Sequence, residues 1–348
     1  MSADPLLQIR DLGVSFLTEE GTVRAVDGVS LDLAAGEILA VVGESGSGKS
    51  VSAMTLLGLT RSPNARFEGT ATYKGTELIG AGDHELQGIR GEEIAMIFQD
   101  PMTSLNPVHK IGDQIAEQIQ AHDKVSDAAA RERSIELLER VGIPRARERV
   151  DSYPHEFSGG MRQRVMIALA LSCDPNILIA DEPTTALDVT IQAQILDRIR
   201  TLRDETGAAV ILVTHDLGVV AELADRVAVM YAGRIVEQGT LDEIFYEPQH
   251  PYTWGLLGSI ARVDRDRPDR LPAIAGLPPS LADRPEGCHF RPRCPHAFGK
   301  CDQTPDLEHR GGGAPGHLDR CWLEAEAKER LRQVDGQIGL RAPEESPA

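Results

Sequence analysis

The sequence contains Gly43-Glu44-Ser45-Gly46-Ser47-Gly48-Lys49-Ser50, a GxxxxGKS stretch. It follows the apolar run Ile38–Val42, which we expect to be a strand, and precedes Val51–Leu59, which we expect to be a helix. Glycines at this spacing let backbone N–H groups point at a phosphate, and a helix N-terminus adds positive partial charge. In this pattern Lys49 reaches the β- and γ-phosphates, and the Ser50 hydroxyl ligates Mg²⁺. The stretch therefore predicts a nucleotide site.

A second apolar run ends in two carboxylates. The residues Ile177–Ala180 lie between Pro175 and Asp181-Glu182-Pro183, a pattern typical of a buried parallel strand. Asp181 would lie at the carboxyl end of this strand, where open α/β sheets bind ligands, and would help to hold Mg²⁺. Glu182 would then polarise the water that attacks the γ-phosphate.

A third segment suggests that two nucleotide domains act together. Ser158-Gly159-Gly160 precedes Arg162-Gln163-Arg164 and the apolar stretch Val165–Cys173, which makes it another anion-binding helix N-terminus. One ATP needs only one such loop per chain, so we expect each domain to lend this loop to its partner's ATP. The segment resembles the signature of ABC-type ATPases. Met161 stands where many of these signatures have glutamine, and we expect little loss of function from it.

The resemblance implies roles for further residues. Gln99, after the strand-like Ile94–Phe98, matches the glutamine that links Mg²⁺ and water to the transport machinery. His215, after the apolar run Val210–Thr214, matches the switch histidine, and an imidazole there could orient the Glu182 water. Thr185–Asp188 matches the loop that communicates across the ATPase dimer. The adenine-stacking residue is left open between Phe16 and Val23, although Phe16 is also well suited to be a core residue.

Composition narrows the classes of function. The formal net charge of −18 argues against binding to nucleic acid and against direct adhesion to anionic lipid. No apolar run approaches the ~20 residues that span a bilayer, and Met1–Pro5 shows no start of a secretory signal. We therefore expect a cytosolic chain that other subunits would hold at a membrane.

The alternation of strands and helices predicts an α/β fold, and the resemblance implies that it is of the ABC-type P-loop ATPase class. We expect a doubly wound, mostly parallel sheet, an antiparallel β subdomain, a helical subdomain and a small Cys-rich C-terminal domain. The expected domains are a nucleotide-binding domain at 1–258, a four-cysteine extension at 259–325, and a segment at 326–348 with a charged helix and a tail, 342–348, that we expect to be disordered. The remaining expected elements are strands at Leu6–Phe16 and Val23–Leu33, helices at Ile111–Gln120, Ala128–Val141 and Val189–Asp204, a strand at Ala208–Val213 and a strand pair within Val227–Ile235.

Four of the five cysteines lie near the C-terminus, at Cys288, Cys294, Cys301 and Cys321. Such clustering in a cytosolic protein favours a metal site over disulfides. The gaps of five, six and nineteen residues fit ordinary zinc ribbons poorly, and four thiolates can also hold a [4Fe–4S] cluster. Spacing alone therefore leaves zinc, an iron–sulfur cluster and no metal all open.

The C-terminal region resembles the extension of ATP-binding subunits from dipeptide and oligopeptide permeases. The matching segments are His250-Pro251-Tyr252-Thr253, Gly276–Leu281, Gly287-Cys288-His289-Phe290 and Pro292-Arg293-Cys294-Pro295. The resemblance implies a [4Fe–4S] cluster on the four cysteines, with zinc as the alternative, and a structural role for it rather than a redox one. It also implies an ATPase that lies on the cytoplasmic face of the cell membrane and uses ATP and Mg²⁺ to energise peptide import.

The implied partners are two transmembrane permease subunits, a second ATP-binding subunit that is a related chain rather than a copy, and an extracytoplasmic substrate-binding protein. The cargo stays open among dipeptides, longer peptides, glutathione-like molecules and metal chelates. The rival hypothesis is a soluble ABC ATPase that acts on ribosomes or DNA. Those proteins usually carry two fused domains or coiled-coil insertions and basic surfaces, whereas this chain has one acidic nucleotide domain.

Overall fold

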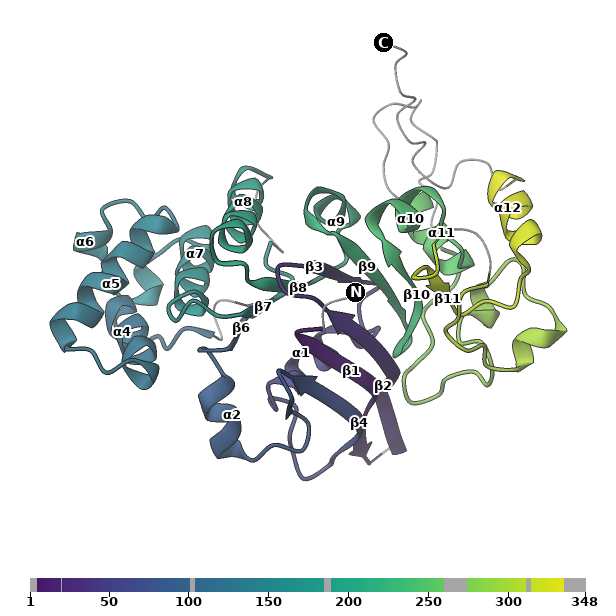
Figure 1. Ribbon diagram of the computed structural model, residues 1–348, viewed down its shortest axis with the longest axis horizontal. Helices are drawn as coiled ribbons and strands as arrows, with labels where there is room; N and C mark the ends of the chain where they lie inside the picture. Colours follow the sequence, from purple (N-terminus) through teal and green to yellow (C-terminus); the bar gives the residue numbers. More distant parts are fainter. Residues whose placement is uncertain are drawn as a thin grey trace, which may run out of the picture.

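The computed structural model describes residues 5–19, 21–100, 104–184, 189–259, 274–310 and 314–334. The predicted dimer-communication loop Thr185–Asp188 and the predicted disordered tail at 342–348 lie outside these residues. Two β-sheets form the centre of the molecule, with a helical lobe at one end and the C-terminal extension at the other (Figure 1).

The larger sheet is mixed and has the strand order β11-β10-β9-β3-β8-β7-β6. The five strands from β9 to β6 run parallel to one another, while β10 and β11 add an antiparallel edge. The bounds of these strands are β3 Ile38–Val42, β6 Ile94–Ile97, β7 Ile177–Asp181, β8 Ala209–Thr214, β9 Arg226–Tyr231, β10 Arg234–Thr240 and β11 Leu318–Asp319. The prediction of a mostly parallel α/β sheet is confirmed.

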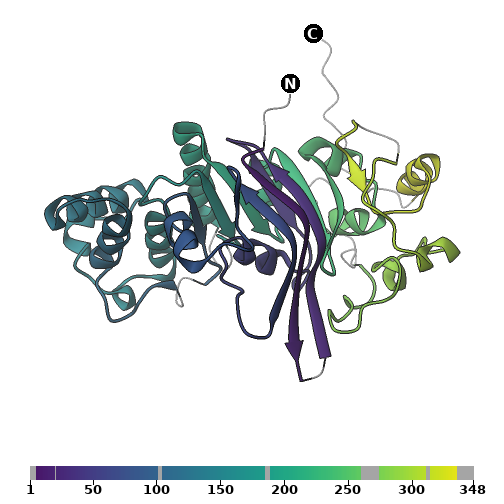
Figure 2. The same cartoon turned by 60° about the horizontal axis from the view of Figure 1, so that its bottom comes forward.

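The smaller sheet is antiparallel in the order β2-β1-β4-β5. Its strands are β1 Leu7–Thr18, β2 Gly21–Leu33, β4 Ala65–Tyr73 and β5 Thr76–Glu77. The first hairpin is longer than the hydrophobic pattern predicts, because cross-strand pairs continue past Phe16↔Val23 to Thr18↔Gly21. Figure 2 shows this hairpin projecting from the body of the molecule.

The helices cover both faces of the larger sheet. Their bounds are α1 Lys49–Leu56, α2 Asp83–Ile89, α4 Ile111–His122, α5 Asp127–Arg140, α6 Ala146–Arg149, α7 Gly159–Ala170, α8 Val189–Thr206, α9 Leu217–Leu223, α10 Leu241–Tyr246, α11 Pro251–Gly258 and α12 Ala325–Val334, with 3₁₀ turns η1 Pro154–Glu156, η2 Arg291–Arg293 and η3 Gly299–Asp302. The predicted helical subdomain is present as α4, α5 and α6, which pack beside α7.

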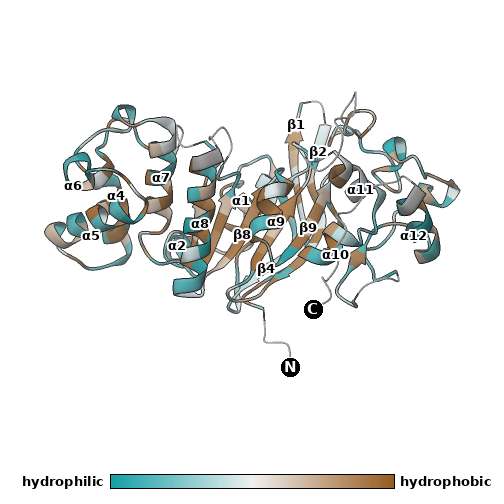
Figure 3. Cartoon of the chain, turned by 90° about the horizontal axis from the view of Figure 1, so that it is seen from above, coloured by the Kyte–Doolittle hydropathy of each residue, from teal (hydrophilic) through white to brown (hydrophobic). Residues whose placement is uncertain are grey.

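The central strands are almost entirely apolar because both of their faces are buried. On β7, Leu178 and Ala180 pack with the helical lobe and α8, whereas Ile177 and Ile179 pack with α1 and the antiparallel sheet. Helix α1 thus lies between the two sheets, in contact with β1 and β2 on one side and β7 and β8 on the other. Figure 3 shows the hydrophobic strands at the centre with more polar helices around them.

The C-terminal extension consists mainly of turns. After η2 and η3 the chain returns to the larger sheet, where β11 pairs with β10, and it then forms α12. Helix α12 begins at Ala325, one residue before the segment at 326–348 in which a charged helix is expected. In the part of the chain that the structure describes, no helix is both long and apolar enough to cross a membrane.

Candidate nucleotide site

The predicted phosphate loop connects β3 to α1. Helix α1 begins at Lys49, two residues before the apolar run, because Gly48 (φ 103°) forms its left-handed N-cap. A Cβ atom at Gly48 would lie 2.4 Å from the carbonyl oxygen of Ala25, and one at Gly43 would lie 2.1 Å from that of Met230. Only glycine fits at these two positions, because a side chain would collide with fixed backbone.

Lys49 lies inside the loop and is 5% exposed. Its ammonium group donates hydrogen bonds to the carbonyl oxygens of Gly43 (2.7 Å) and Glu44 (3.0 Å). Burial lowers the pKa of Lys49, while the nearby Glu182, Asp181 and Glu44 act in the opposite direction. Both of its hydrogen bonds go to neutral carbonyls, so an anionic phosphate is a favourable further partner for the ammonium group.

Ser50 and Asp181 meet across the space between α1 and β7. The Ser50 hydroxyl donates to Asp181 Oδ1 at 2.9 Å. Asp181 is buried, and this burial raises its pKa, although the Ser50 hydrogen bond opposes the change. A hydroxyl and a carboxylate oxygen are hard ligands of the kind that Mg²⁺ takes together with phosphate oxygens. The donor set therefore fits the predicted ion.

Glu182 is the centre of the second part of the site. Its Oε2 accepts a hydrogen bond from Gln99 Nε2 at 2.9 Å, and its Oε1 lies 3.1 Å from Nδ1 of His215. These three residues follow β7, β6 and β8, which are parallel neighbours, so their side chains meet at one edge of the sheet. Glu182 has φ 47°, an uncommon backbone conformation of the kind that clusters at functional sites.

The predicted signature segment forms the start of α7. Ser158 is the N-cap, and its side chain accepts a hydrogen bond from the N–H of Met161 at 3.4 Å. Ser158 and Gly159 are exposed. Among the described residues, no hydrogen bond joins Ser158, Gly159 or Gly160 to the phosphate loop. Within one chain the two anion-binding helix starts are thus separate features.

The four C-terminal cysteines line one small cavity, together with side chains that include His250, Phe290 and Trp322. Burial raises the pKa of Cys294 and of Cys321 to about 12. Over the described ranges, no three His, Cys, Asp or Glu side chains are arranged to hold one metal ion. Cys173 lies elsewhere, with its thiol 3.7 Å from the carbonyl oxygen of Gln118.

Two contacts to the phosphate loop were not predicted from the sequence. The backbone N–H of Glu44 donates to the Tyr252 hydroxyl at 2.9 Å, and the Glu44 carboxylate accepts two hydrogen bonds from Arg293, at 2.6 and 3.0 Å. Both residues lie in segments that resemble peptide permeases, but separations of 208 and 249 residues carry no periodic signal that could place them here.

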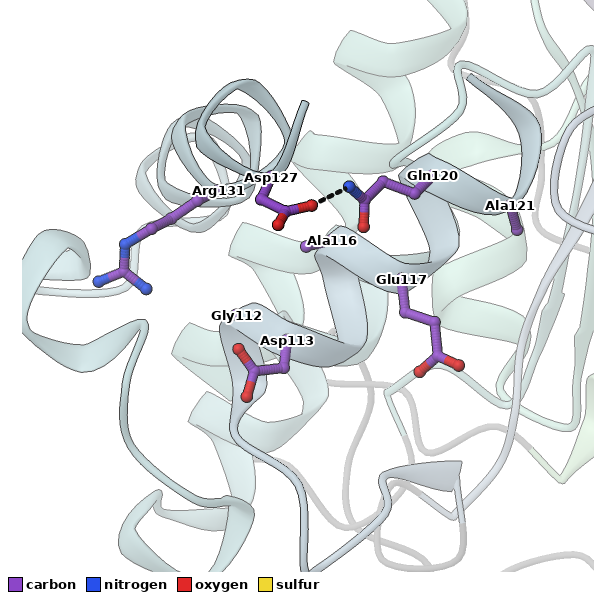
Figure 4. A pocket seen from close by; sticks show the side chains of 8 residues that line it. All are labelled: Gly112, Asp113, Ala116, Glu117, Gln120, Ala121, Asp127 and Arg131. Carbon is purple, nitrogen blue, oxygen red and sulfur yellow. Dashed lines mark hydrogen bonds between the residues drawn. The ribbon is translucent and has the colours of Figure 1, made fainter. Parts of the chain in front are cut away.

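A separate surface hollow lies on the helical lobe, between α4 and α5 (Figure 4). Asp127 there accepts a hydrogen bond from Gln120, and Arg131 pairs with Asp151. The hollow contains no residue of the phosphate loop or of the Gln99, Glu182 and His215 cluster. It is therefore not part of the candidate nucleotide site.

The phosphate loop, the Ser50–Asp181 pair and the Glu182 cluster, on a mixed sheet with a helical lobe, define an ABC-type ATPase cassette. Residues 26–185 match the family model described as ABC transporter, and residues 236–301 match the one described as Oligopeptide/dipeptide transporter, C-terminal region. The chain is also similar to the dimeric structure of a post-hydrolysis state of the ATP-binding cassette MJ0796 bound to ADP and Pi. That similarity has a TM-score of 0.62 and 27% identity, and covers 68% of this chain and 98% of that one.

Curated relatives match along most of the chain. The oligopeptide transport ATP-binding protein OppD of Escherichia coli (strain K12) is 51% identical over 324 residues, which are 93% of this chain and 95% of that protein. The dipeptide transport ATP-binding protein DppD of Bacillus subtilis (strain 168) is 52% identical over 328 residues, or 94% of this chain and 97% of that protein. The chain belongs to the family of ATP-binding subunits of oligopeptide and dipeptide ABC transporters.

Proposed function

We propose that this chain hydrolyses ATP to energise the import of peptides through an ABC transporter. The observation that carries the proposal is the placement of Glu182 between Gln99 and His215, at the sheet edge that also presents Asp181 to Ser50. Full-length similarity to proteins named for oligopeptide and dipeptide transport supports the class of cargo.

Each part of the site has one role in this proposal. Residues 43–50, namely Gly43, Glu44, Ser45, Gly46, Ser47, Gly48, Lys49 and Ser50, bind the phosphates. Ser50 and Asp181, with Gln99, surround Mg²⁺, which would neutralise charge on the phosphates. Glu182 polarises the attacking water. His215 holds Glu182 from one side and Gln99 holds it from the other, so that the carboxylate is already in place when the nucleotide binds.

The proposal includes a second cassette. Ser158 and Gly159 are exposed and Gly160 is half-buried at the start of α7, and the backbone N–H groups of a helix start favour an anion. We place this segment against the ATP that the opposing subunit binds, and we expect that subunit to be a related chain. The remaining partners are two membrane permease subunits and an extracytoplasmic substrate-binding protein, and the chain lies peripherally on the cytoplasmic face.

Isolation of the chain with its neighbours tests this assembly. A tagged chain expressed in the organism that naturally produces it should copurify from detergent-solubilised membranes with two hydrophobic subunits and a second ATPase. Mass spectrometry would identify these copurifying subunits. Copurification with ribosomes or DNA, and without membrane subunits, would instead support the rival soluble ATPase, which the similarities to transport proteins do not favour.

The proposal also assigns the four C-terminal cysteines to a [4Fe–4S] cluster with a structural role. Four thiols that line one cavity are a suitable donor set for such a cluster. A single zinc ion is the alternative, and it would need all four sulfurs at about 2.3 Å from one point. We expect the cluster to stabilise the extension at 259–325 beside the nucleotide-binding domain at 1–258, because the described part of the extension consists mainly of turns.

Anaerobic purification should give a brown protein with broad absorption near about 400 nm. The Cys301→Ser variant should lose that absorption and its iron because it removes one ligand, whereas Cys173→Ser should keep both because Cys173 lies outside the cavity. A colourless wild-type protein that carries one zinc per chain would contradict the cluster.

A further inference from the structure

The C-terminal extension reaches into the phosphate loop through one side chain. Arg293 ends the turn η2 and immediately precedes Cys294, which lines the cysteine cavity. Its side chain is only 4% exposed and pairs with Glu44, the second residue of the loop. In Figure 1 the extension lies beside β9 and β10, on the side of the sheet away from the helical lobe.

The guanidinium of Arg293 uses all of its donors. A guanidinium has five N–H groups. Nη1 donates to Glu44 Oε2 (2.6 Å) and to the Tyr231 hydroxyl (3.3 Å), and Nη2 donates to Glu44 Oε1 (3.0 Å) and to the carbonyl of Ile274 (3.3 Å). Nε donates to the carbonyl of Ala275 at 2.9 Å. The shortest of these bonds goes to the loop, and the fork on Glu44 is the arrangement that fixes a carboxylate most firmly.

Glu44 is consequently held at three places. Arg293 holds its carboxylate, Tyr252 accepts from its N–H, and Lys49 donates to its carbonyl oxygen. Two of these three contacts come from beyond residue 250, in the part of the chain that follows the last parallel strand. The shape of the loop therefore depends on segments outside the parallel-sheet core.

The contact with Arg293 also compensates the negative charge of Glu44. A carboxylate in a loop that binds a triphosphate repels the ligand, and this repulsion is stronger near a protein surface than in bulk water. A buried guanidinium cancels that charge and prevents the carboxylate from turning elsewhere.

We propose that Arg293 is a positioning residue for nucleotide binding, which neutralises Glu44 and holds the phosphate loop in its binding shape. The C-terminal extension is thereby part of the machinery that sets ATP affinity. This inference rests on the proposed assignment of residues 43–50 as the ATP site.

The test measures the Kd for ATP by equilibrium dialysis of the full chain, with thermal unfolding as a check on folding. Arg293→Gln leaves the Glu44 charge uncompensated, so we expect the Kd to rise about tenfold. The double variant Glu44→Gln/Arg293→Gln removes that charge as well, and its Kd should return to within about threefold of the wild-type value. Arg293→Lys keeps the charge but loses the fork, so a rise of roughly threefold is expected. This variant serves if Arg293→Gln does not fold.

Arg320→Gln is the matched control. Arg320 precedes Cys321 as Arg293 precedes Cys294, and it fastens the extension through the carbonyls of Ile235 and Pro305 without touching the loop. We expect its Kd for ATP to stay at the wild-type value. An equal rise in Arg320→Gln, a double variant as weak as Arg293→Gln, or an unchanged Kd in Arg293→Lys would each overturn the inference.

The variant Lys49→Ala tests separately whether residues 43–50 are the ATP site, which is the assignment on which the role of Arg293 rests. Wild-type affinity in Lys49→Ala would remove the assignment of the loop itself. Loss of binding in Lys49→Ala, together with no change in Arg293→Gln, would leave the loop assignment standing and remove only the role of Arg293.

Discussion

Replacement of Glu182 with glutamine should leave ATP binding close to wild type and should lower hydrolysis by roughly 10²–10⁴-fold, the usual contribution of a positioned general base. Glutamine keeps the size of the side chain and can still accept from Gln99, but it cannot take a proton from water. The phosphate loop and the Ser50–Asp181 pair are untouched by the change. The measurements are the rate of phosphate release and the Kd for ATP in the same preparation.

The Glu182→Gln variant should also trap the ATP-loaded pair of cassettes. Size-exclusion chromatography with ATP should show the chain bound to its partner cassette, because hydrolysis can no longer separate them. Addition of Ser158→Arg should abolish the pairing and leave ATP binding to the chain's own loop intact, since Ser158 has no hydrogen bond to that loop. Phosphate release at the wild-type rate in Glu182→Gln would remove Glu182 from the role of base.

The second large effect concerns stability. Lys328 of α12 and Asp319 of β11 form an ion pair at 2.7 Å, and their side chains are 2% and 1% exposed. Lys328→Met leaves a buried carboxylate without its counter-charge, so the free energy of unfolding should fall by about 3–5 kcal/mol. Denaturation by urea measures the change. Asp319→Asn/Lys328→Met should recover a large part of it, because the remaining amide oxygen can still accept from the N–H of Cys321.

The loss in Lys328→Met should depend on pH in a defined direction. Burial already raises the pKa of Asp319, and Lys328 opposes that shift. Without Lys328 the pKa in the folded state rises further above its unfolded value, so the folded state binds a proton more readily than the unfolded state does. The variant is then least destabilised at low pH, and the loss grows as the pH rises through the folded pKa. A deficit that stays constant as the pH rises from below the ordinary carboxyl pKa of about 3.9 to neutrality would contradict this account.

The sequence predicts which residues lie together in the candidate nucleotide site, because each of them follows a local pattern. Each of Gln99, Asp181 and His215 comes directly at or after an apolar run that forms a parallel strand, and parallel strands bring their carboxyl ends to one edge. The glycine loop likewise has its own spacing. Periodicity was less informative at the ends of elements, where cross-strand pairing lengthened the first hairpin to Thr18↔Gly21.

The contacts of the extension could not be predicted in the same way. Arg293 and Tyr252 reach Glu44 only because the larger sheet places β9 and the C-terminal turns beside the phosphate loop, and no local pattern encodes that meeting. The cysteine spacing left the metal open, because the relevant quantity is the three-dimensional arrangement of the sulfurs. The structure brings all four thiols to one cavity, and their occupant stays a prediction.

Strand β11 has a consequence for any shortened form of the protein. It hydrogen-bonds along β10 through Gln238↔Leu318 and Glu237↔Asp319, so a protease that removed everything after α11 would leave β10 without this neighbour. Uncovered strand edges recruit other chains and promote aggregation. Strand β11 thus protects the edge of the ATPase sheet. We expect a protein cleaved after α11 to precipitate rather than to remain as a smaller active ATPase.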